Sequence, residues 1–115
     1  MSAHIAGQLA CWPTKDRMAA ILRDAGLQVH EGRYSVRIEG CSYFVFQEYG
    51  GDLGEPAVDA DADTVEELMR EGRLVSDALA RAGLRHRFEI YNDRDELCGY
   101  LHHEWPMQEN TEGCK

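Results

Sequence analysis

The sequence predicts a single α+β domain in which a largely antiparallel sheet carries two helices on one face. Its 115 residues are 43% hydrophobic and 29% charged, a composition typical of a chain that folds around one core. Two stretches carry apolar residues at helical spacing. The segments around them alternate apolar and polar residues and are joined by short turns, the pattern of antiparallel hairpins.

The first expected strand spans residues 4–12, where apolar side chains alternate, although Gly7 interrupts the pattern. The first expected helix spans residues 13–27. It begins at a Pro-Thr pair, continues with apolar residues at helical spacing, and ends at Gly26, where a left-handed C-cap is expected.

Residues 33–49 predict a hairpin whose second strand is rich in aromatic residues. The side of that strand that faces the core depends on the length of the turn. A three-residue turn places Phe44 and Phe46 inside, and a two-residue turn places Tyr43 and Val45 inside. We prefer the phenylalanines as the buried pair.

Residues 50–63 are rich in glycine and aspartate and predict the longest loop. The alternating aspartates are similar to a calcium-binding loop, but Thr64 replaces the turn glycine and Arg70 replaces the final glutamate, so calcium binding is disfavoured. A second helix is expected over residues 64–84, because Thr64 and Glu67 have capping-box spacing and an apolar stripe follows.

Residues 85–105 predict a closing hairpin with its turn at residues 92–95. An even-length turn sorts the apolar residues to one face. It pairs Ile90 with Leu97, Phe88 with Gly99 and His86 with Leu101. The domain is expected to end at residue 106, and the polar residues 107–115 to form a disordered tail.

The predicted element order is βαββαββ. This order resembles a ferredoxin-like plait with one additional terminal strand, in which both helices cover the same face of the sheet. The resemblance concerns the fold pattern, and no family motif accompanies it.

Charge and composition exclude several classes of partner. Twelve basic against twenty-one acidic side chains give a net charge of −9, which repels phosphate backbones, so nucleic acid is not expected. The sequence has neither an apolar run of about 20 residues nor a charged and apolar leader, so we expect a cytoplasmic protein without a membrane partner. Four cysteines without a Cys-x-x-Cys pair predict reduced thiols.

The stretch GYLHHEWP, residues 99–106, suggests a metal or catalytic site. Strand alternation sends His102 and Glu104 to one face and His103 to the other, so the three cannot hold one ion together. His86 and His103 could meet at the core-side edge of the sheet. Neither the pair of His102 and Glu104 nor the pair of His86 and His103 supplies the three or four ligands that zinc requires. We therefore expect no metal and no cofactor.

Two hypotheses for function follow. The less favoured of the two is a small enzyme or metal-binding protein built on His86, His102, His103 and Glu104. In it, His102 and Glu104 act as an acid and base pair. An enzyme is not favoured, because the sequence contains neither a nucleophile elbow nor a phosphate loop.

The leading hypothesis is a non-enzymatic protein-interaction module that binds a protein partner, blocks one as an inhibitor does, or forms a homodimer through the sheet face opposite the helices. Aromatic and arginine side chains anchor such interfaces. The candidate binding residues are Arg87, Tyr91, Tyr100, His102, Glu104 and Trp105.

Overall fold

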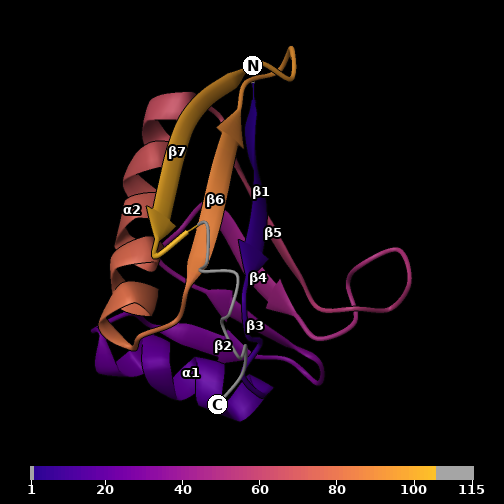
Figure 1. Ribbon diagram of the computed structural model, residues 1–115, viewed down its shortest axis with the longest axis vertical. Coiled ribbons are helices and arrows are strands. Elements are labelled where there is room, and N and C mark those ends of the chain that lie inside the picture. Colours follow the sequence, from indigo (N-terminus) through magenta and orange to yellow (C-terminus); the bar gives the residue numbers. More distant parts are fainter. Residues whose placement is uncertain (1, 106–115) are drawn as a thin grey trace.

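The computed structural model describes residues 2–105, which form one antiparallel sheet and two helices (Figure 1). The elements in chain order are β1 (Ala3–Leu9), α1 (Lys15–Asp24), β2 (Val29–Glu31), β3 (Ser35–Ile38), β4 (Tyr43–Gln47), β5 (Ala57–Ala62), α2 (Val65–Arg81), β6 (His86–Tyr91) and β7 (Leu97–His103).

The described strands lie in the order β2-β3-β4-β5-β1-β6-β7, and each neighbouring pair is antiparallel. The α+β class and the antiparallel sheet are therefore confirmed. The predicted element order βαββαββ and the plait order derived from it are wrong, because the chain forms two further strands, β2 and β5, between the helices.

Strand β5 runs through residues that the sequence predicted to be a loop. Its side chains alternate, with Ala60 and Ala62 buried and Asp59 and Asp61 exposed. Alanine and aspartate are depleted in strands, so composition concealed the alternation. Because β5 pairs with β4 on one side and β1 on the other, these residues lie inside the sheet.

Both helices pack on the same face of the sheet and share one buried hydrophobic cluster with it. Phe44 and Phe46 lie in this cluster, as preferred from the sequence. Val45 is buried too, on the opposite face, beside Arg37 and Tyr43. The described residues thus form one domain with the core between helices and sheet.

The helix ends follow the sequence signals. The Thr14 hydroxyl accepts a hydrogen bond from the Arg17 N–H at 3.2 Å, and Thr64 accepts one from the Glu67 N–H at 3.1 Å, as the capping-box spacing predicted. Gly26 adopts a φ of +89° just after α1, a conformation that glycine takes at little cost.

Gly7 has a packing reason in the interior of β1. A Cβ atom at this position would lie 3.0 Å from Phe88 Cδ1 and 3.2 Å from Val58 Cβ. The missing side chain lets the Phe88 ring pack directly against β1, so this glycine supports the strand that it seemed to weaken.

The β6–β7 register differs from the predicted one. His86 lies opposite His103 and Phe88 opposite Leu101, and an irregularity follows at Ile90 and Tyr91. The predicted pairs were therefore displaced by two positions, because the bulge beside the turn could not be seen in the alternation pattern. The even displacement keeps the side chains of residues 99–103 on their predicted faces, but past the irregularity Leu97 lies opposite Tyr91 instead of Ile90 and is 58% exposed, so its predicted inward position is wrong.

Three remaining expectations concern the C-terminal tail, the cysteines and the absence of a membrane-spanning helix. The predicted tail, residues 107–115, lies outside the described residues. Cys41 and Cys98 are free thiols, but Cys11 is disulfide-bonded, so the prediction of reduced cysteines is wrong for Cys11. Neither described helix is long and apolar enough to cross a bilayer.

Candidate functional site

One face of the sheet is covered by neither described helix, and we call it the open face. Strand alternation places polar and aromatic side chains on it from β1, β3, β4, β6 and β7. Its main residues are His4, Arg37, Tyr43, Arg87, Glu89, Tyr91, Tyr100 and His102.

Four of the six predicted binding residues lie together on the open face. Arg87 is opposite His102 in the β6–β7 register. The Tyr100 and His102 rings stack with centroids 4.9 Å apart, and the Arg87 guanidinium carbon lies 5.4 Å from the centre of the Trp105 ring. The structure therefore joins Arg87, Tyr100, His102 and Trp105 into one aromatic and cationic cluster.

Tyr91 lies apart from this cluster, near the other end of β6. Its hydroxyl donates a hydrogen bond to Glu89 Oε1 at 3.0 Å, and its ring stacks on His4 with centroids 5.5 Å apart. The hydrogen bond to Glu89, followed by desolvation, raises the pKa of the Tyr91 hydroxyl. Tyr91 therefore lies on the open face, but it contacts His4 and Glu89 and not the aromatic and cationic cluster.

The predicted His102 and Glu104 pair does not form. Strand β7 ends at His103, and Glu104 adopts a φ of +52°, so strand alternation no longer applies to it. Its carboxylate lies 3.7 Å from His103 Nε2 instead. The proposed acid and base pair is therefore corrected to a contact between Glu104 and His103.

His86 is fully buried and both of its ring nitrogens are engaged. Nδ1 donates to the Leu84 carbonyl at 2.8 Å, which leaves Nε2 to accept from the Ser76 hydroxyl at 2.7 Å. Desolvation lowers the pKa of His86 and favours this neutral form. Within residues 2–105 no three His, Cys, Asp or Glu side chains are grouped to hold a metal ion.

A cleft of about 630 Å³ opens on the open face where β1 and β5 separate, and we call it the β1–β5 cleft. The paired register of these strands covers Ala3–Ile5 and Ala60–Ala62. Figure 1 shows β5 leaving the side of β1 toward the loop that precedes it. Arg87, Glu89 and Trp105 line this cleft, so it adjoins the aromatic and cationic cluster.

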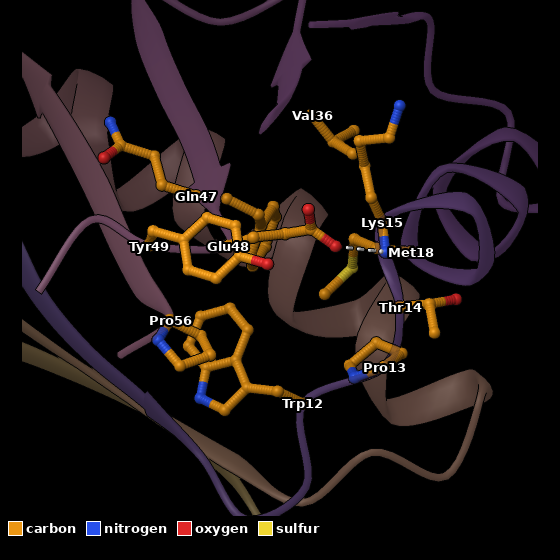
Figure 2. Close-up of a pocket in the computed structure, with 11 residues that line it drawn as sticks. Trp12, Pro13, Thr14, Lys15, Met18, Val36, Gln47, Glu48, Tyr49 and Pro56 are labelled. Carbon is orange, nitrogen blue, oxygen red and sulfur yellow. Dashed lines mark hydrogen bonds between the residues drawn. The ribbon is translucent and has the colours of Figure 1, made fainter. Parts of the chain in front are cut away.

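A smaller pocket of about 200 Å³ lies beside the N-terminus of α1, and we call it the Trp12 pocket (Figure 2). Its main walls come from Trp12, Met18, Phe46, Glu48, Tyr49 and Pro56. Trp12 and Pro56 also line the β1–β5 cleft, so the two hollows adjoin. Together they form what we call the Trp12 groove.

Among the described residues that line the Trp12 pocket, Glu48 carries the one carboxylate. Its Oε2 accepts a hydrogen bond from the backbone N–H of Lys15 at 3.3 Å, at the first residue of α1. This N–H is one of those that a helix leaves without an internal partner, and the helix dipole favours a negative charge there. Glu48 is thereby fixed at the edge of an apolar and aromatic hollow.

The sequence did not identify Trp12, Glu48, Tyr49 or Pro56 as candidate site residues. A tryptophan directly before the Pro-Thr start of a helix is a weak signal for a packed aromatic residue. The meeting of the β1–α1 turn with the end of β4 depends on strand order, and that order was predicted wrongly because β5 was read as loop.

No protein-family model matches the chain, and neither a curated protein nor a solved structure matches it. The functional argument therefore depends on the chemistry of the open face and of the Trp12 groove.

Proposed function

We propose that this chain is a protein-binding module that holds a partner against its open face. The observation that carries the proposal is the cluster of Arg87, Tyr100, His102 and Trp105 on a sheet face that neither described helix covers. Tyr100 remains 42% exposed although its ring is large and apolar. Tyrosine, tryptophan and arginine are the residue types that contribute most to protein interfaces.

The stacking within the cluster favours binding because it orders these side chains in advance. Tyr100 rests on His102, and Arg87 rests on Trp105. Side chains that are already held lose less conformational entropy when a partner covers them. A partner would therefore meet a preformed surface.

The charge of the chain favours a basic partner over a second copy of itself. Each copy carries a net charge of −9, so two copies repel one another over distance, whereas a basic protein is attracted. Of the two partner classes considered from the sequence, we therefore propose a different, basic protein.

A photo-crosslinking comparison tests this function. A benzophenone amino acid replaces either Tyr100 on the sheet or Leu74 on α2, which is 52% exposed and serves as the matched helix-side control. We expect position 100 to capture a defined partner in extracts of the native cells and position 74 to capture none. Equal capture at both positions, or capture at position 74 alone, would contradict the proposal.

Affinity measurements with the captured partner complete the test. We expect Tyr100→Ala to weaken binding by about 30-fold, which corresponds to a hot-spot loss of about 2 kcal/mol. Leu74→Ala should leave the dissociation constant unchanged. An unchanged dissociation constant for Tyr100→Ala would show that the partner binds elsewhere.

A further inference from the structure

We infer that the Trp12 pocket binds an arginine side chain from an extended, basic segment of the partner protein. This inference rests on the proposed function, because the Trp12 groove continues from the open face through the β1–β5 cleft. It names the chemistry of the partner and the point at which that partner is anchored.

The walls of the pocket suit the flat guanidinium group and the apolar stem of arginine. Figure 2 shows the Trp12 indole, the Tyr49 ring and the Glu48 carboxylate around one opening. Tyr49 is 64% exposed, so much of its ring is available to a ligand. Met18 and Phe46 supply apolar surface for the stem of the side chain. Guanidinium groups stack on aromatic faces and form paired hydrogen bonds with carboxylates.

The groove has unpaired negative charge, whereas its own cations are already paired. The Lys15 ammonium lies 3.6 Å from Glu31 Oε1 and donates to the Gly32 carbonyl, and Arg87 lies 3.8 Å from Glu89. Figure 2 shows the Lys15 ammonium pointing away from the Trp12 indole.

Among residues 2–105, by contrast, no basic side chain forms an ion pair with Glu48 or Glu55. Their described hydrogen bonds come from the backbone N–H groups of Lys15 and Leu53. Two carboxylates at the groove are therefore available to a cationic ligand, and an anionic ligand would be repelled.

The dimensions of the Trp12 pocket itself suit one side chain of a partner. The Trp12 pocket measures about 200 Å³, which is below the range of about 300–1,000 Å³ that is usual for small-molecule sites. The adjoining β1–β5 cleft, at about 630 Å³, provides room for the residues that flank the arginine. An extended segment could thus place one side chain in the pocket and its neighbours along the sheet.

Peptide titration tests this inference on the full chain. The probe is a capped heptapeptide of valine, threonine and serine with one central arginine, and its control carries citrulline, an uncharged arginine isostere. Two-dimensional amide NMR follows the backbone signals of Trp12, Lys15 and Tyr49. We expect the arginine peptide to shift these signals with saturation, and the citrulline peptide to bind about three to ten times more weakly.

Two variants and one matched control locate the effect. Glu48→Gln retains an acceptor for the Lys15 N–H but removes the charge, and Tyr49→Ala removes one exposed wall; each should weaken the arginine peptide by about three- to tenfold. Glu66→Gln, an exposed carboxylate in the first turn of α2, should have no effect. Equal affinity for both peptides, or unchanged affinity in Glu48→Gln, would overturn the inference.

The same variants separate this inference from the proposed function. A partner whose binding needs Tyr100 but is unaffected by Glu48→Gln overturns the arginine anchor and leaves the open-face function standing. Arginine-dependent peptide binding at Glu48, together with a partner that is unaffected by Tyr100→Ala, supports the anchor and overturns the open-face function.

Discussion

The two faces of strand β6 differ in what fixes their side chains. His86, Phe88 and Ile90 point into the core and are completely buried, whereas Arg87 and Glu89 point to the open face and are partly exposed. The inward residues are held on all sides by helices and sheet. The outward residues are held by single stacks and ion pairs, so they can be rearranged or covered without unfolding the chain.

Histidine illustrates what this difference teaches. His86 and His102 lie on neighbouring strands and belong to the same hairpin. His86 is a buried structural group with two internal hydrogen bonds, whereas His102 is exposed and stacks on one tyrosine. The residue type alone therefore does not indicate function, and the face on which the residue lies decides between the two roles.

The largest expected difference is between the effects of Phe88→Ala and Tyr100→Ala on the free energy of unfolding. Phe88 is fully buried and packs on Phe44, with ring centroids 5.8 Å apart. Phe88→Ala should lower the free energy of unfolding by about 3–5 kcal/mol, because it leaves a cavity in the core. Tyr100→Ala should lower it by no more than about 1 kcal/mol. Urea denaturation measures both, and similar losses would show that the two faces are equally packed.

The next largest expected effect is the dependence of the free energy of unfolding on pH, which the buried His86 causes. Desolvation lowers the pKa of His86 below its ordinary value of 6.5, so the unfolded chain takes up the proton first as the pH falls. The free energy of unfolding should be independent of His86 above about pH 6.5. It should decrease below that pH by at most about 1.4 kcal/mol per pH unit, the limit for one proton, until His86 is also protonated in the folded chain.

Urea denaturation at several pH values between 5 and 7 tests this expectation. The contribution of Glu31 lies at lower pH: the hydrogen bond from Arg23 lowers the pKa of Glu31 below 4.5, so the stabilisation that Glu31 provides is lost only under more acidic conditions. His86→Leu should flatten the pH dependence between 5 and 6.5. A wild-type chain with constant stability over this range would show that His86 accepts a proton without cost.

The sequence predicted features that depend on local patterns. Alternation identified the inward side of β6 and, over residues 99–103, of β7, and the Thr64 cap with its downstream glutamate located the start of α2. Prediction from the sequence failed where tertiary structure overrides local propensity. Strand β5 forms from alanine and aspartate because strands on both sides pair with it. The Trp12 groove depends on that strand, so it could not be predicted either.

The smallest expected effect is that of His102 on stability. Its ring stacks on Tyr100 but lies outside the buried cluster, so His102→Ala should change the free energy of unfolding by no more than about 1 kcal/mol. The pH dependence between 5 and 6.5 should also remain, because His86 is unchanged. If instead His102→Ala removed that dependence, the pH-sensitive group would lie on the open face, and the structural role assigned to His86 would be wrong. This variant therefore separates the two histidines by measurement, and any loss of partner binding in it can be assigned to the open face because the core is intact.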